Sequence, residues 1–114
     1  EAVAVTGDLE TLMAGLACGE VSSLAWEILA TGGDDFMTLS EDAVAPLMKM
    51  LAQGYKTDAA VEAGESAVPG LAGAIVAAQS DEYRQTLGLT SESKILVIGT
   101  EGATDPELYQ SLIK

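Results

Sequence analysis

The sequence predicts an α/β fold: a layered domain with a parallel sheet of about three short strands and flanking helices. Two observations support this class. Short apolar runs alternate along the chain with amphipathic helical patterns. The most apolar run, in Lys94–Thr100, shows no polar alternation, as expected of a strand that is buried on both faces of a parallel sheet. With 114 residues, the chain is long enough for one hydrophobic core, so we expect a single domain or a fragment of a larger one.

The first third of the chain predicts two helices and one strand. Apolar residues recur at helical spacing in residues 7–19, where Asp8 can cap the start and a glycine follows the pattern. Residues 22–33 repeat this arrangement, with a serine before the apolar stripe and two glycines after it. A short apolar run predicts a buried strand in residues 35–39.

The middle of the chain predicts one more helix and a second strand. Ser40 can cap the helix start, the two acids that follow it complement the helix dipole, and the stripe continues to Gly54. Pro46 comes a turn and a half after this start, so we expect a bend in the helix or a later beginning. The next strand candidate covers residues 58–64.

Three helices and the last strand are expected in the remainder. Ser66 can cap a helix that contains Gly70 and Gly73, each of which lowers helix propensity by roughly 1 kcal/mol relative to alanine. Such glycines imply close packing against a neighbour. Residues 80–88 predict a short helix, and after the strand in residues 94–100 the final helix begins at Asp105.

The charge excludes several classes of partner. Eighteen acids against five bases give a net charge of −13, which repels nucleic acid and anionic membranes. Most of the acids lie at helix starts or in polar turns, a pattern typical of a solvated surface. No apolar run is long enough to span a membrane and no signal-peptide pattern is present, so we expect a cytoplasmic protein.

The cysteine and histidine content limits the chemistry. Cys18 is the only cysteine, so the chain cannot form an internal disulfide, and we expect a small buried residue here more than a nucleophile. The chain has no histidine, which removes Cys/His metal sites and the commonest general base. We therefore expect no metal site and no nucleophilic triad.

Polar residues follow two of the predicted strands. Ligands of parallel sheets bind at the carboxyl ends of strands, and Gly64–Ser66 and Gly99–Glu101 both lie at such ends. A glycine turn that opens a helix can bind phosphate, but Glu65 places a negative charge there. Neither a Walker sequence nor a G-x-G-x-x-G motif is present. We interpret the turn as a helix start first and as the wall of a ligand site second.

Each polar side chain at these ends has two interpretations. Glu65 either supports the backbone or faces a ligand, and Glu101 suits backbone support better than a ligand role. The Thr100 hydroxyl either satisfies a turn or bonds the ring nitrogen of a ligand that is held over the sheet edge.

Four stretches carry a resemblance to a known family: MAGLACGE, LAWEIL, GES followed by GL, and LVIGTEGATDPELY. Together they resemble the C-terminal portion of the diaminopropionate ammonia-lyases, which are pyridoxal-phosphate enzymes of the fold type II group that includes threonine and serine dehydratases. The resemblance runs from Gly7 to about Tyr109. AGLACGE and the stretch from Thr100 to Asp105 are specific to the lyase branch, whereas the glycine turn and the last strand occur across the wider group.

The resemblance implies a lyase of amino acid metabolism that eliminates ammonia from 2,3-diaminopropionate to give pyruvate, with pyridoxal 5'-phosphate held by a lysine. In this family that lysine and the glycine loop that binds the phosphate precede the matched portion. The chain is then a C-terminal fragment that contains no catalytic residue, binds no cofactor alone and is inactive alone. A fragment would expose apolar surface, so we expect a homo-oligomer, at least a dimer.

The match extends to individual residues at both strand ends. The family's turn is G-E-S-G-A, and Gly64–Ser66 match it while alanine and valine replace its last two residues. The implied role of this turn is to wall the cofactor ring. At the end of the last strand the lyases have serine-threonine where this chain has Gly99 and Thr100, so either Thr100 or water is implied as the partner of the ring nitrogen. The implied cofactor-binding residues are Gly64, Glu65, Ser66, Gly99 and Thr100.

An alternative from another class stays open. The same residues suit a free-standing acidic α/β domain that binds a small molecule or a partner protein without catalysis. An upstream reading frame with a lysine in the family's usual context favours the lyase, and an initiator methionine just before Glu1 favours the free-standing domain.

Overall fold

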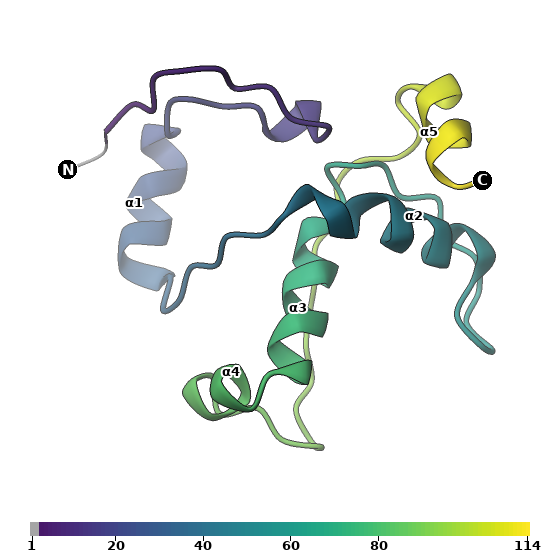
Figure 1. The fold of residues 1–114 in the computed structure, drawn as a ribbon. Coiled ribbons are helices and arrows are strands. Elements are labelled where there is room, and N and C mark those ends of the chain that lie inside the picture. Colours follow the sequence, from purple (N-terminus) through teal and green to yellow (C-terminus); the bar gives the residue numbers. More distant parts are fainter. Residues whose placement is uncertain (1–2) are drawn as a thin grey trace. The chain divides into compact units, whose positions relative to one another are not determined.

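The computed structural model describes residues 3–114, and all regular structure in this range is helical (Figure 1). The chain divides into two compact units, Glu1–Thr38 and Leu39–Lys114. In chain order the elements are the 3-10 helix η1 (Ala14–Leu16), α1 (Ser23–Gly32), the 3-10 helix η2 (Glu41–Ala43), α2 (Val44–Gln53), α3 (Pro69–Gln79), α4 (Asp81–Thr86) and α5 (Pro106–Leu112).

The predicted α/β fold with a parallel sheet is wrong, because no residue from 3 to 114 belongs to a strand. A strand needs a ladder of backbone hydrogen bonds to a neighbour. One such bond, from the Gly64 N–H to the Glu101 carbonyl (3.0 Å), connects the ends of two of the predicted strands, which is too little for a ladder. The apolar runs indicated a tendency to be buried, but pairing also requires a second strand alongside.

The first unit contains α1, which confirms the second predicted helix. The Ser22 hydroxyl accepts a hydrogen bond from the Ala25 N–H (3.4 Å), and the helix ends before Gly33. The helix predicted in residues 7–19 is reduced to the single turn η1. There the Thr11 hydroxyl accepts the Met13 N–H (3.1 Å), a local bond that competes with helical hydrogen bonding.

No residue from 3 to 38 is buried. Short helices in water depend on packing of their apolar face, so the weak helix in residues 7–19 has little to stabilise it. Cys18, which we expected to be a small buried residue, is exposed for the same reason.

The second unit begins with η2 and α2, as predicted. The Ser40 hydroxyl accepts the Asp42 N–H (3.3 Å) at the start of η2. The α-helix itself starts only at Val44, so Pro46 lies within its first turn, which confirms the later beginning. Gly54, with φ of 74°, ends the helix in the left-handed region that favours glycine.

The helix α3 begins later than expected. Its first residue is Pro69, and the residue before it makes no side-chain cap, so the prediction that Ser66 caps this helix is wrong. Ser66 belongs instead to a turn in which the Ala67 N–H donates to the Gly64 carbonyl (3.1 Å). The close packing predicted from the helix glycines is not found at Gly70, where a methyl group would lie 3.7 Å from Cβ of Val97, an ordinary van der Waals distance.

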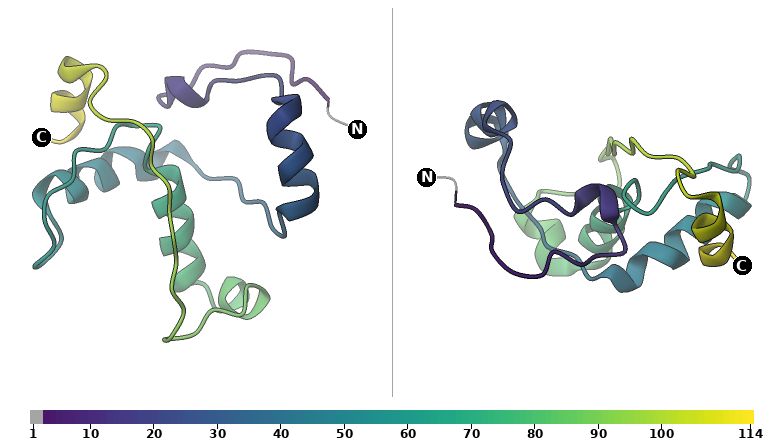
Figure 2. Two further views of the ribbon diagram at one scale, coloured as in Figure 1. Left: turned by 180° about the vertical axis from the view of Figure 1, so that it is seen from behind. Right: turned by 90° about the horizontal axis from the view of Figure 1, so that it is seen from above.

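The two last helices form as predicted, and each begins with a local cap. The Ser80 hydroxyl accepts the Tyr83 N–H (3.3 Å) at the start of α4. At the start of α5 the Asp105 carboxylate accepts the Leu108 N–H (3.0 Å). Between them, residues 94–100 run as an extended segment beside α3 (Figure 2).

The core of the second unit lies where α2 packs against α3 and α5. Its buried apolar residues are Val44, Met48, Ala63, Val68, Ala72, Ala77 and Tyr109. In contrast, the extended segment presents apolar side chains to solvent: Leu96 is 87% and Ile98 75% exposed. Such a run of exposed apolar residues is typical of a surface that contacts another molecule.

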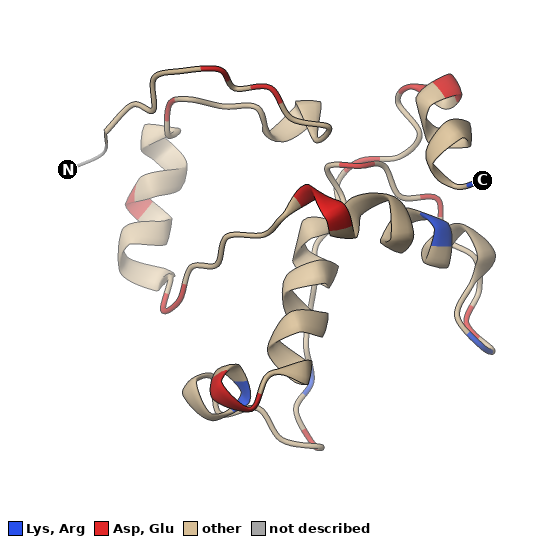
Figure 3. Ribbon diagram, in the orientation of Figure 1, with Lys and Arg blue, Asp and Glu red and all other residues tan. Residues whose placement is uncertain are grey.

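Acidic positions are spread along both units, and basic positions are few (Figure 3). Among residues 3–114, none of the helices combines the length and the hydrophobicity needed to cross a bilayer.

Candidate functional site

The structure brings together the two predicted strand ends, both of which lie in the second unit. The Gly64 N–H donates to the Glu101 carbonyl (3.0 Å), and the Ser66 N–H donates to Oε2 of the Glu101 carboxylate (2.6 Å). The turn Gly64–Ala67, which we call the wall turn, therefore lies directly against Gly99–Gly102. Whether these residues bind a cofactor is a separate question, and that role stays a prediction.

Two of the predicted site residues are glycines because the two segments approach each other closely. A methyl group on Gly64 would overlap the Gly102 carbonyl oxygen and lie 2.7 Å from the Glu101 carboxylate. A methyl group on Gly99 would lie 3.0 Å from the Ala67 carbonyl oxygen. Any larger residue would push the wall turn away from the other segment, so both glycines act through packing.

Glu65 is a charged residue in the core, with only 6% of its surface exposed. Its carboxylate has no hydrogen bond or ion pair with any residue that the structure describes. No fully buried side-chain oxygen in residues 3–114 lacks a partner, so the Glu65 oxygens must reach solvent. A carboxylate with a buried stem and oxygens that keep some solvent contact can accept a hydrogen bond from water or from a ligand.

The Thr100 side chain is exposed, and the described residues provide no partner for its hydroxyl. A threonine hydroxyl can donate one hydrogen bond and accept others. The interpretation as a satisfied turn threonine therefore has no supporting contact in this part of the chain, and the hydroxyl is available to a ligand.

Glu101 supports the backbone, which is the role that its position in the sequence favoured over ligand binding. A second carboxylate, which the sequence analysis missed, makes the reverse contact: Oε1 of Glu62 accepts the Ala103 N–H (3.3 Å). Each segment thus provides a carboxylate to an amide of the other. The only available signal for Glu62 was an acid just before a glycine turn, which is too common to identify a contact made 41 residues away.

The wall turn is poorly suited to bind a phosphate group. An anion at a helix start binds to free backbone N–H groups, but the Ser66 N–H is occupied by a carboxylate. Glu65 and Glu101 also place two negative charges beside the turn, which would repel a phosphate. This geometry agrees with the sequence-based argument against phosphate at this position.

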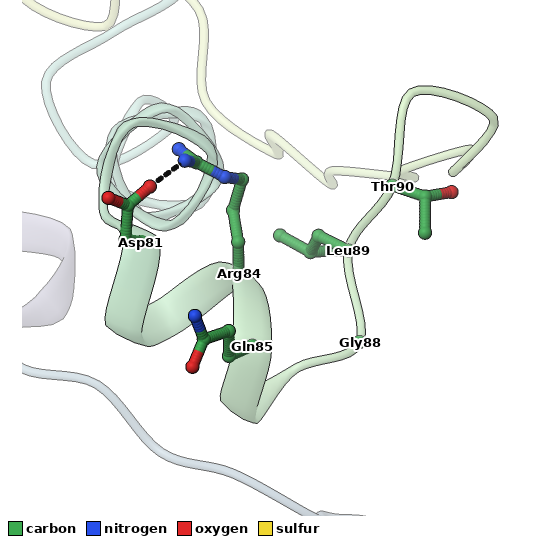
Figure 4. Close-up of a pocket in the computed structure, with 6 residues that line it drawn as sticks. All are labelled: Asp81, Arg84, Gln85, Gly88, Leu89 and Thr90. Atoms are coloured by element: carbon green, nitrogen blue, oxygen red, sulfur yellow. Dashed lines mark hydrogen bonds and ion pairs between the residues drawn. The ribbon is translucent and has the colours of Figure 1, made fainter.

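A separate hollow of about 330 Å³ lies beside α4 (Figure 4). It is lined by Asp81, Arg84, Gln85, Gly88, Leu89 and Thr90. The Arg84 guanidinium is already paired with Asp81 and also donates to the Ala78 carbonyl (2.7 Å). None of the predicted site residues lines this hollow.

The chain was compared with family models, with curated proteins and with solved structures. No family model matches the chain. The chain is 38% identical to the diaminopropionate ammonia-lyase of Escherichia coli (strain K12) over 97% of its own length, but this covers only 29% of that protein. It is 32% identical to the diaminopropionate ammonia-lyase of Salmonella typhimurium (strain LT2), with 96% of this chain and 28% of that protein covered. The chain therefore spans less than a third of the length of the curated relatives it matches.

Solved structures agree with these relatives. The crystal structure of the Escherichia coli diaminopropionate ammonia-lyase in complex with an aminoacrylate-PLP azomethine reaction intermediate matches with a TM-score of 0.81 and 35% identity, over 90% of this chain and 28% of that chain. The same enzyme in complex with D-serine matches with a TM-score of 0.78 and 33% identity, over 87% and 26%. The resemblance is confirmed: over nearly its whole length, this chain is homologous to diaminopropionate ammonia-lyase.

Proposed function

We propose that this chain is the C-terminal part of a pyridoxal-phosphate-dependent ammonia-lyase of the fold type II group, acting on 2,3-diaminopropionate. The elimination and the hydrolysis that follows consume one water and yield pyruvate and two ammonia molecules. The observation that carries this proposal is the 38% identity to a diaminopropionate ammonia-lyase over 97% of the chain. The TM-score of 0.81 to that enzyme with its PLP-bound intermediate supports it further.

In this proposal the chain provides one wall of the cofactor site. Gly64, Glu65 and Ser66 line the ring, Gly99 allows the two segments to approach, and the Thr100 hydroxyl serves the ring nitrogen. When bound, the cofactor supplies an electron sink for the carbanion at the substrate's α-carbon. A neutral hydroxyl on the ring nitrogen makes this sink milder than a carboxylate partner would, which suits elimination.

We further propose that the chain alone is inactive, because none of its four lysines lies in the sequence context of the family's cofactor lysine: Lys49, Lys56, Lys94 and Lys114. Lys49 donates to the Lys114 carbonyl, and the Lys56 ammonium lies over the Tyr55 ring, 5.0 Å from its centroid. Neither lysine has a recorded contact with the wall turn. The lysine of the complete enzyme would then come from polypeptide outside this chain.

The proposal also includes the domain to which the chain belongs, its oligomeric state and its place in the cell. We place the 114 residues within a larger catalytic domain, since they correspond to less than a third of the relatives. We expect a dimer or a larger homo-oligomer, because apolar side chains such as Leu96 lie exposed. A cytoplasmic enzyme is consistent with the single cysteine.

The direct test uses the full-length protein that contains this chain. Pyruvate formed from 2,3-diaminopropionate is followed with lactate dehydrogenase and NADH, before and after removal and return of pyridoxal phosphate. We expect turnover that depends on the cofactor. The 114-residue chain should give no pyruvate and no absorbance band of bound cofactor. A full-length protein that forms no pyruvate from this substrate, or forms it equally well without the cofactor, would overturn the proposal.

A further inference from the structure

We propose that Glu101 is a positioning residue for the cofactor site: it holds the wall turn in place through the Ser66 N–H and does not contact the cofactor itself. This inference rests on the proposed function, because it concerns the same site. It assigns Glu101 a role distinct from those of the predicted cofactor-binding residues.

The contact between Glu101 and the wall turn uses two different acceptors of one residue. Its carboxylate Oε2 accepts the Ser66 N–H at 2.6 Å, and its backbone carbonyl accepts the Gly64 N–H at 3.0 Å. Hydrogen bonds to an ionised acceptor are shorter and stronger than neutral ones. Ser66 and Glu101 are both partly buried, so water competes less for this bond than at an open surface.

The hydrogen bond between Ser66 and Glu101 also lies next to the predicted cofactor-binding side chains. Ser66 directly follows Glu65, and Glu101 directly follows Thr100. The bond therefore links the residues next to the two side chains predicted to face the ring. Each predicted ring contact is joined by one peptide bond to a residue that makes this hydrogen bond, so the bond limits how far Glu65 and Thr100 can move apart.

The second carboxylate contact is weaker and does not replace it. Oε1 of Glu62 accepts the Ala103 N–H at 3.3 Å, and Glu62 is exposed to solvent. Exposed hydrogen bonds gain little over water. Loss of the Glu101 carboxylate should therefore release the wall turn even when Glu62 is intact.

The experiment compares Glu101→Met with Glu101→Gln in the full-length protein. The two replacements have similar length, but only glutamine keeps a strong oxygen acceptor for the Ser66 N–H. We expect Glu101→Met to speed hydrogen exchange in peptides that cover residues 64–68 by about tenfold or more, and to weaken pyridoxal-phosphate affinity by about tenfold or more. Glu101→Gln keeps a weaker, neutral hydrogen bond, so we expect clearly smaller changes than for Glu101→Met in both measurements.

Glu92→Met is the matched control. It removes the same negative charge from an exposed residue whose carboxylate accepts a hydrogen bond from the neighbouring Ser91 hydroxyl (3.4 Å) and from no other residue in the described range 3–114. It should change neither exchange in residues 64–68 nor cofactor affinity. If Glu101→Met fails to fold, Glu101→Asp tests the same bond, because it keeps the charge but shortens the side chain by one methylene. We then expect cofactor affinity to fall by about fivefold or more.

Each outcome decides one point. Unchanged exchange in Glu101→Met overturns the bond itself, and faster exchange with unchanged cofactor affinity overturns the positioning role. Equal effects of Glu101→Gln and Glu101→Met also overturn the inference, since glutamine still offers an oxygen acceptor to the Ser66 N–H and methionine does not. Failure of the proposed function is seen separately, because the parent protein would then bind no pyridoxal phosphate while exchange still reports the bond.

Discussion

Gly64 and Gly102 lie so close together that a methyl group on Gly64 would overlap the Gly102 carbonyl oxygen. We therefore expect Gly64→Ala to lower the free energy of unfolding by about 1–3 kcal/mol, because the obstacle is backbone and cannot rotate away. Urea denaturation followed by circular dichroism measures the change. The control is Gly32→Ala, since nothing lies within 4 Å of a methyl group on Gly32. It should be neutral or stabilise α1 by up to about 1 kcal/mol, and equal losses in both variants would contradict the close approach.

The second prediction concerns the contribution of the buried core of the second unit to stability. Met48 is completely buried, whereas Met37 is 41% exposed. We expect Met48→Ala to lower the free energy of unfolding by about 2–5 kcal/mol through lost burial and the cavity left behind. Met37→Ala should change it by no more than about 0.5 kcal/mol. Chemical denaturation of both variants tests this pair, and a loss of similar size for Met37→Ala would show that the packing is different.

The third prediction concerns the Thr100 hydroxyl. Thr100→Val in the full-length protein removes the hydroxyl but keeps the shape of the side chain. If the hydroxyl serves the ring nitrogen, the absorbance spectrum of the bound cofactor should shift and turnover should fall by up to about tenfold. Thr104→Val, at an exposed threonine four residues further along the chain, is the control and should leave both unchanged. An unchanged spectrum and turnover in Thr100→Val would exclude this role.

The fourth prediction follows from the exposed apolar segment in residues 94–100. We expect the isolated 114-residue chain to sediment as a dimer or larger species, because Leu96 and Ile98 leave most of their surface in water. Leu96→Lys should shift the population towards the monomer, since a charged side chain is costly to bury. A parent chain that sediments as a monomer at all concentrations would contradict self-association through this segment.

Local sequence patterns were sufficient to predict where most of the helices begin. The starts of α1, η2 and α5 follow the serines and the aspartate that were predicted to cap them, and Ser80 caps α4 in the same way. These caps bond to amides two or three residues away, so the pattern and its partner lie within one short window. The helix predicted in residues 7–19 did not form, because its apolar stripe has no surface to pack against within its own unit.

Prediction from local sequence patterns failed for the three expected strands. The segment Lys94–Thr100 is as apolar as a buried strand and runs extended, but none of residues 3–114 pairs with it in a ladder. Composition reports how strongly a segment avoids water, whereas a strand is defined by its hydrogen-bonded neighbour. A pattern within one segment contains no information about whether that neighbour is present.

By itself, the sequence determined the family, the acidic charge, the capped helices and the two polar turns that were expected to form one site. Only the tertiary structure decided that Glu101 binds the Ser66 amide, that Glu62 makes the reverse contact, and that Gly64 and Gly99 are required by the close approach of two segments. The reason is separation along the chain. Ser66 and Glu101 are 35 residues apart, so their contact depends on how the whole second unit packs and not on any local pattern.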